Sequence, residues 1–133
     1  MNKTVLITGA SGGIGFEMAR VFAEKGYNLV MVARRRETMD ALAEEVNKKY
    51  GINAHVLVQD LAIEGSGKRL YEEVSRMNIK PDIVINNAGF ADYGKFVERN
   101  WEKVRDMIMV NVMALTEITR MFAGDMVQRG SGK

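Results

Sequence analysis

The stretch Thr8-Gly9-Ala10-Ser11-Gly12-Gly13-Ile14-Gly15 decides the fold of this chain. It follows the apolar run 5–7, which is typical of a buried strand, and it precedes a pattern with helical periodicity. Glycines at such a junction let the chain turn sharply and approach a pyrophosphate, while the helix N-terminus offers unpaired N–H groups to the anion. The spacing differs from the G-x-G-x-x-G form. The order strand, glycine turn, helix favours a phosphate site, and the alternative at this point is a tight connection without a ligand.

Further strands and helices alternate along the chain. We expect strands at residues 3–8, 28–33, 53–59 and 82–86, and helices at residues 13–25, 36–50, 64–77 and from an N-cap at Asn100 to Arg129. In the first helical pattern, Ile14, Met18, Val21 and Phe22 fall on one face. The expected buried stripe of the last helix is Val104, Ile108, Val112, Leu115, Thr119, Phe122 and Met126. This alternation predicts a single α/β domain over residues 1–133, with a Rossmann-type doubly wound parallel sheet, strand order 3-2-1-4 and helices on both faces.

Composition excludes several classes of function. The 133 residues include no Cys, so disulfides, thiolate zinc sites and a cysteine nucleophile are excluded, and we expect no metal site. A net charge of +2 gives no reason to expect a nucleic-acid partner. We find no secretory signal and no apolar run as long as a membrane span, so the expected location is cytoplasmic.

Three arginines follow the second expected strand, at the place where a dinucleotide-binding unit reads the adenosine ribose. An acidic residue there would accept from the ribose hydroxyls of NAD, whereas guanidinium groups bind a 2′-phosphate. Arg34 and Arg35 therefore favour NADP(H) over NAD(H). The alternative is a solvated basic surface, but cations at a helix N-terminus oppose the helix dipole unless an anion lies nearby.

Two polar signals follow the third and fourth strands. The Asp60 carboxylate has two equally weighted roles, accepting from an adenine amino group or capping the next turn. In the run Asn86-Asn87-Ala88-Gly89, small residues allow a flat ring to lie against the backbone, and buried Asn side chains can tie strands together.

The glycine turn, Asp60 and the Asn-Asn-Ala-Gly run together resemble the short-chain dehydrogenase/reductase family, over essentially the whole chain. The resemblance implies that Gly9, Ser11, Gly13, Ile14 and Gly15 line the cofactor phosphates and ribose. It implies that Asp60 and Leu61 hold the adenine, that Asn86, Ala88 and Gly89 lie beside the riboses, and that the arginine pair is of the NADP-preferring type. It also implies that the backbone carbonyl of Asn111 holds a water of the proton relay; a structural hydrogen bond of its side chain is the alternative.

The proton donor of this family is a Tyr followed four residues later by a Lys, and none of the Tyr residues here has that spacing. The resemblance therefore implies the N-terminal portion of such an enzyme, truncated before the fifth strand. The full-length parent would transfer hydride between NADP(H) and a small-molecule carbonyl or alcohol, and this chain alone would be inactive. The alternative is a non-catalytic dinucleotide-binding or protein-interaction module.

Truncation would leave the fourth strand as an edge with unpaired backbone groups and would expose apolar residues of the long helix. We therefore expect self-association through that edge or that helix. In the loop after the fourth strand, we expect Phe90, Tyr93 and Phe96 to pack onto the fourth helix, although they could also border a substrate pocket.

Overall fold

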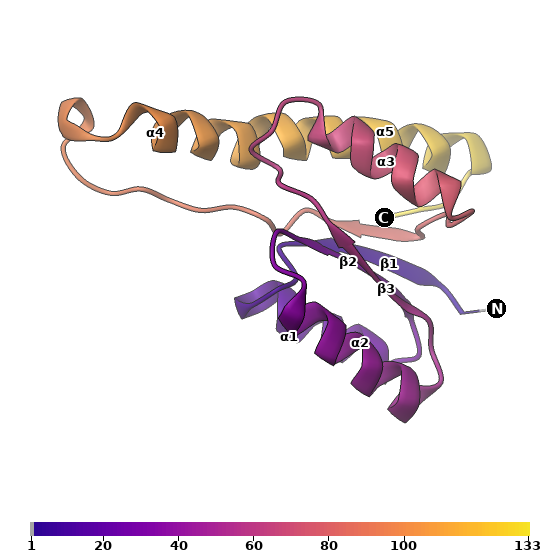
Figure 1. Cartoon of the computed structure of the whole chain (residues 1–133). Coiled ribbons are helices and arrows are strands. Elements are labelled where there is room, and N and C mark those ends of the chain that lie inside the picture. Colours follow the sequence, from indigo (N-terminus) through magenta and orange to yellow (C-terminus); the bar gives the residue numbers. More distant parts are fainter. Residues whose placement is uncertain (1) are drawn as a thin grey trace.

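Four parallel strands form a sheet in the order β3-β2-β1-β4, between two layers of helices (Figure 1). The computed structural model describes residues 2–133. The strands are β1 (Thr4–Thr8), β2 (Asn28–Ala33), β3 (Ala54–Val58) and β4 (Ile83–Ile85). The helices are α1 (Gly13–Glu24), α2 (Glu37–Tyr50), α3 (Ser66–Arg76), η1 (Phe96–Glu98), α4 (Trp101–Ile108), η2 (Met109–Ala114) and α5 (Leu115–Arg129). The predicted fold class and strand order are confirmed, and the predicted element ends are right to within two residues.

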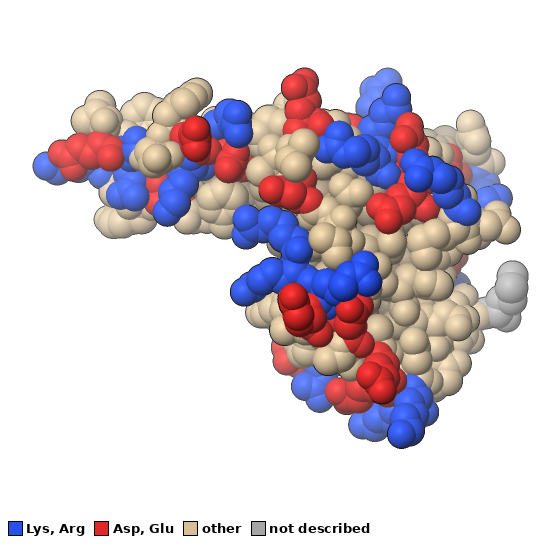
Figure 2. Space-filling model, in the orientation of Figure 1, with Lys and Arg blue, Asp and Glu red and all other residues tan. Residues whose placement is uncertain are grey.

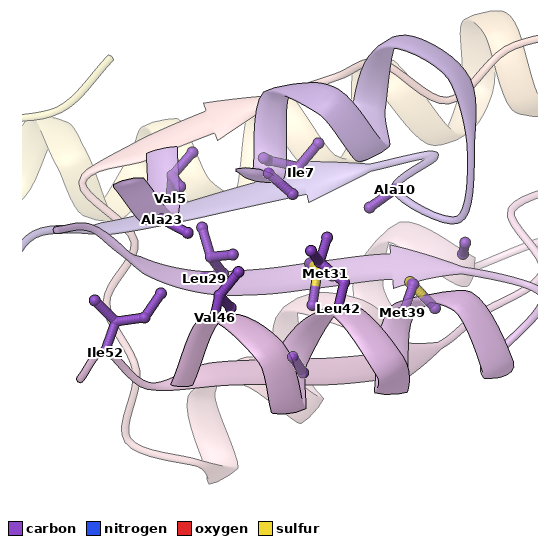
Figure 3. Close-up of a cluster of buried hydrophobic side chains, with 13 residues drawn as sticks. Val5, Ile7, Ala10, Ala23, Leu29, Met31, Met39, Leu42, Val46 and Ile52 are labelled. Carbon is purple, nitrogen blue, oxygen red and sulfur yellow. The ribbon is translucent and has the colours of Figure 1, made fainter. Parts of the chain in front are cut away.

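The two central strands supply both faces of the core, because successive side chains of a strand point to opposite sides. Leu29 and Met31 of β2 pack with α1 and α2 in one cluster, shown in Figure 3. Val30 and Val32 pack with α3 and α5 on the other face of the sheet. All four side chains are fully buried, so β2 has the continuous apolar sequence expected of a strand covered on both faces.

The predicted apolar face of α1 is only partly buried: Met18 and Phe22 pack against the core, but the most buried residues of the helix lie beside this face. These buried residues are Gly15, Ala19 and Ala23, whereas Ile14 is 73% exposed and Val21 is 48% exposed. Small residues at intervals of four allow the helix axis to approach the sheet closely, and the larger side chains then project to the sides. By contrast, the buried stripe of α2 is as its sequence periodicity indicates: Met39, Leu42, Ala43 and Val46.

One continuous helix extends from Trp101 to Arg129, with a π-helical segment, η2, in its middle. The Asn100 side chain accepts from the backbone N–H of Lys103 at 3.1 Å, so the predicted N-cap is confirmed. The predicted buried stripe is right at Val104 and Phe122. It is wrong at four exposed positions, Ile108, Val112, Leu115 and Thr119, and it missed the buried Ala114 and Ile118. The wider π turn changes which side chains face the sheet, and an α-helical periodicity cannot anticipate that change.

The same helix corrects the expectation that no apolar run is as long as a membrane span. It is long and apolar enough, by length and composition, to cross a membrane, with a mean hydropathy of 1.2 over its best window. Core helices of globular proteins meet the same criterion, so the observation assigns no location.

The outer edge of β4 is partly occupied. Val84 N–H donates to the carbonyl oxygen of Lys133 at 2.9 Å, and Lys133 N–H donates to that of Asp82 at 3.0 Å. The expectation that this edge presents unpaired backbone groups is therefore wrong at Asp82 and Val84. The turn after α5, with Gly130 at φ +69°, returns the chain to the sheet at this point.

Candidate functional site

A cavity of about 400 Å³ lies at the carboxyl ends of the strands, where the strand order reverses between β1 and β4. Ligands of doubly wound sheets bind at such switch points. Its walls are the glycine turn, the arginine turn after β2, the turn after β3, the loop after β4 and one side of α4. The predicted site residues that line it are Gly9, Ser11, Gly13, Arg34, Arg35, Asp60, Leu61, Ala88 and Gly89. Four others lie outside its lining: Ile14, Gly15, Asn86 and Asn111.

The glycine turn needs its glycines for two different reasons. Gly9 has φ +68°, and a Cβ there would lie 2.9 Å from the Cα of Ala88, so a side chain would separate β1 from the loop after β4. Gly13 has φ +55° but open space around it, so its requirement is conformational. Among residues 2–133, no side chain caps the N-terminus of α1 and no acidic residue occupies its first turn. Its N–H groups can therefore receive an anion.

The neighbouring residues Ile14 and Gly15 lie outside the cavity lining, and only Gly15 is required by close packing. A Cβ on Gly15 would overlap the carbonyl oxygen of Gly9 and the side-chain amide of Asn87. Ile14 borders a separate apolar hollow along the outer side of α1, together with Met18 and Val21. The implied contacts of these two residues with a cofactor stay predictions.

Hydrogen bonds fix the end of β1 against the loop after β4. The buried Thr8 hydroxyl accepts from the backbone N–H groups of Asn87 and Ala88, at 3.1 and 3.0 Å. The Asn87 side chain donates to the carbonyl oxygens of Thr8 and Gly9, at 3.1 and 3.2 Å. The expectation that an Asn ties adjacent strands is confirmed at Asn87, and the contribution of Thr8 was missed.

Asn86 makes a different contact. Its amide nitrogen donates to the Thr119 hydroxyl of α5 at 2.9 Å. Its side-chain oxygen is buried and has no hydrogen-bond partner within residues 2–133. Asn86 therefore joins the end of β4 to the long helix and does not line the cavity.

Arg34 and Arg35 are the cationic residues of the cavity lining, which also contains Asp60 and Asp106. Both arginines are exposed, and neither forms an ion pair in the described part of the chain. Arg36 does not line the cavity and pairs with Asp40 at 3.8 Å. Figure 2 shows Lys and Arg side chains gathered at the step between the layer of α3 to α5 and the layer of α1 and α2. Two guanidinium groups are thus available to an anion in the cavity.

The turn after β3 supports both roles considered for Asp60. Its Oδ1 atom accepts from the backbone N–H of Ala62 at 3.0 Å, which is the capping role. The residue also lines the cavity, and Leu61 beside it is 7% exposed and packs into the core below. The turn is therefore held by its own hydrogen bond while it remains accessible to a ligand.

Asn111 lies in the π-helical segment and binds the loop after β4. Its side-chain oxygen accepts from Phe90 N–H at 3.0 Å, and its amide nitrogen donates to the Phe90 carbonyl oxygen at 2.8 Å. This is the structural hydrogen bond considered as the alternative, made to a loop segment. The catalytic role implied for its backbone carbonyl stays a prediction.

Sequence reasoning missed two cavity residues on α4 and η2, Asp106 and Val110. They lie in a stretch without a motif, so no local signal identified them. The packing expected for the loop aromatics is wrong at Tyr93, which is 95% exposed, and at Phe96, which is 75% exposed, whereas Phe90 borders the cavity, as the alternative expected. The loop and α4 extend beyond the sheet, where little of the chain can cover them (Figure 1). Within residues 2–133, no cluster of His, Cys, Asp and Glu has the arrangement of a metal site.

Comparison with known proteins identifies the family. The sequence profile described as short chain dehydrogenase matches residues 3–133, and this chain belongs to that family. A very-long-chain 3-oxoacyl-CoA reductase of Phaeosphaeria nodorum is 35% identical in an alignment 133 positions long, which covers 96% of this chain and 38% of that protein.

Solved structures agree in fold. A short-chain dehydrogenase from Sphingobium yanoikuyae in complex with NADPH has a TM-score of 0.90 at 38% identity, covering 98% of this chain and 51% of that one. A bulky-bulky ketone specific alcohol dehydrogenase from Comamonas testosteroni has a TM-score of 0.89 at 37% identity, covering 98% and 52%. This chain therefore spans about half, or less, of the length of these relatives.

Proposed function

We propose that this chain is the NADP(H)-binding portion of an NADP-dependent oxidoreductase. One observation carries the proposal: Arg34 and Arg35 line the same cavity as the uncapped N-terminus of α1. Within residues 2–133, neither of the two guanidinium groups forms an ion pair. That helix end and the glycine turn suit a pyrophosphate, and the arginines suit a 2′-phosphate. The NADPH complex of the similar Sphingobium enzyme supports this assignment.

The full-length parent would transfer hydride between NADP(H) and a carbonyl or alcohol, and the bound nicotinamide would supply the hydride chemistry. Residues of this chain would bind the phosphates, receive the adenine and orient the cofactor at the switch point. The names of the relatives, a 3-oxoacyl-CoA reductase and a ketone-specific alcohol dehydrogenase, support the carbonyl and alcohol class. Alone, this chain would turn over no substrate, because no Tyr in it precedes a Lys by four residues.

Calorimetric titration of the purified chain with NADPH and, separately, with NADH tests the proposal. We expect saturable binding of both, with tighter binding of NADPH. Arg34→Gln and Arg35→Gln should each weaken NADPH binding and leave NADH binding unchanged. Arg36→Gln is the matched control, since the neighbouring Arg36 does not line the cavity. Equal affinities for the two cofactors, or an Arg34→Asp variant that still prefers NADPH, would overturn the assignment.

We further propose that the chain self-associates through its long helix. Ile108, Val112 and Met113 are each about half exposed, at 48%, 54% and 50%, and lie close together on α4 and η2. Contact between two copies would remove this apolar surface from water. Sedimentation velocity should show a mass that rises with concentration, and Val112→Lys should return the chain to a monomer. A monomer at every concentration would contradict this proposal.

A further inference from the structure

A single side-chain hydrogen bond joins the two turns that carry the candidate site. The Thr38 hydroxyl, in the first turn of α2, donates to the carbonyl oxygen of Ser11 in the glycine turn at 2.7 Å. The two residues are 27 positions apart in the sequence. Within residues 2–133, no other side-chain hydrogen bond links the glycine turn to residues 33–38.

The other contacts of the arginine turn are local to it or to α2. Arg36 occupies the N-cap position of α2 without a side-chain cap, and Glu37 and Asp40 in the first turn of α2 offset the charges of the arginines at this end of the helix dipole. The ion pair of Arg36 with Asp40 lies within α2 and does not reach the glycine turn. A backbone hydrogen bond from Ala10 to Val32, at 3.2 Å, connects the strand ends before the arginines begin. The Thr38 contact is therefore the link between the glycine turn and the chain that follows the arginines.

We propose that Thr38 is a positioning residue for cofactor selectivity. By holding the Ser11 carbonyl, it fixes the separation between the turn that receives the pyrophosphate and the arginines that receive the 2′-phosphate. NADPH has to satisfy both turns at once, whereas NADH places no phosphate on the arginines. Loss of the link therefore weakens NADPH binding selectively. The inference rests on the proposed function of the cavity.

Calorimetry on Thr38→Val, Thr38→Ser and the unaltered chain tests it, with NADPH and NADH as ligands. Valine keeps the branched shape and removes the donor, and serine keeps the donor. The net value of one hydrogen bond corresponds to a loss of about 3-fold to 10-fold in NADPH affinity for Thr38→Val. We expect unchanged NADH affinity in that variant and recovery of NADPH affinity in Thr38→Ser. Thr116→Val is the control, because the Thr116 hydroxyl donates to the carbonyl oxygen of Val112 in the long helix and neither residue lines the cavity.

The outcomes separate the two proposals. If the unaltered chain prefers NADPH and Thr38→Val keeps the same ratio of affinities, the inference is wrong and the proposed function stands. A parallel loss for both cofactors would also overturn it, since that is the effect of a merely structural residue. If the unaltered chain binds neither cofactor, the proposed function fails and the inference fails with it.

Discussion

The hydroxyl of Thr8 accepts the backbone N–H of Asn87 at 3.1 Å, and the Asn87 side chain donates back to the Thr8 carbonyl oxygen at the same distance. This reciprocal pair joins β1 to the loop after β4, at the point where the strand order reverses. The backbone of the cavity wall is thereby set before any ligand arrives.

Thr8→Val should destabilise the chain strongly. Valine matches threonine in shape but leaves the N–H groups of Asn87 and Ala88 without their acceptor. We expect the free energy of unfolding to fall by about 2 to 4 kcal/mol, measured by urea denaturation. Thr8→Ser should retain most of the stability. A Thr8→Val variant as stable as the unaltered chain would show that water satisfies these groups.

Gly15→Ala and Gly124→Ala should change stability in opposite directions. A methyl group at Gly15 would overlap the Gly9 carbonyl oxygen, so α1 has to move away from the turn. Such overpacking costs about 1 to 3 kcal/mol. Gly124 lies inside α5 with open space around it, and alanine there should add about 0.5 to 1 kcal/mol. Thermal unfolding of both variants checks the pair, and a loss of stability in both would refute our account of Gly124.

Tyr71 links α3 to α5 in a pH-dependent manner. Its hydroxyl donates to both oxygens of Asp125, at 3.0 and 2.9 Å, and this hydrogen bond, with burial and the carboxylate charge, raises the pKa of Tyr71 above 10.0. Because the pKa is higher in the folded state, the stabilisation is complete below pH 10 and is lost as pH rises through the folded-state pKa. Tyr71→Phe should cost about 1 kcal/mol at pH 7. That difference should shrink in urea titrations above pH 10.

Tyr93→Phe is the control for this prediction, because Tyr93 is 95% exposed. Tyr93→Phe should leave the free energy of unfolding unchanged both at pH 7 and above pH 10. A constant difference between Tyr71→Phe and the unaltered chain across pH 7 to 11 would contradict the coupling.

Asn111→Leu should release the loop after β4. Leucine has a similar volume but cannot hold the backbone N–H and carbonyl groups of Phe90. In hydrogen-exchange measurements, we expect the Phe90 amide to exchange at least tenfold faster. A tenfold faster exchange corresponds to a fall of about 1.4 kcal/mol in the free energy of opening the loop. The amides of β2 should keep their protection. An unchanged rate at Phe90 would mean that other contacts hold the loop.

Local sequence signals predicted the scaffold well. The ends of β2 were predicted to the residue, because a buried apolar run there is bounded by Gly26 on one side and by Arg34 on the other. The strand order followed from the right-handed connection rule, and the N-cap at Asn100 from its side chain. These features depend on a few neighbouring residues, so a single sequence contains them.

Tertiary contacts account for what the sequence left undecided. The π turn at 109–114 changes which face of the long helix is buried, and its residues contain no sequence signal that predicts a π turn. In the sequence, Thr8 has the pattern of an ordinary strand residue. Its role depends on contact with Asn87, which lies 79 positions away in the chain. The cavity residue Asp106 is likewise identified only by the fold. Glycine, arginine and asparagine motifs located most of the cavity because each follows the end of a strand.

The pairing of Lys133 with β4 bears on how the chain behaves at high concentration. Ile83, Val84 and Ile85 are among the strongest strand formers, and an open edge of this composition is a template for amyloid-like growth. Here β4 is only three residues long. At its outer edge, the backbone of the cationic residue Lys133 already pairs with the Val84 N–H group and the Asp82 carbonyl oxygen. The β4 edge is thus blocked at two of its backbone groups, and pairing of two copies through this edge would first have to displace Lys133.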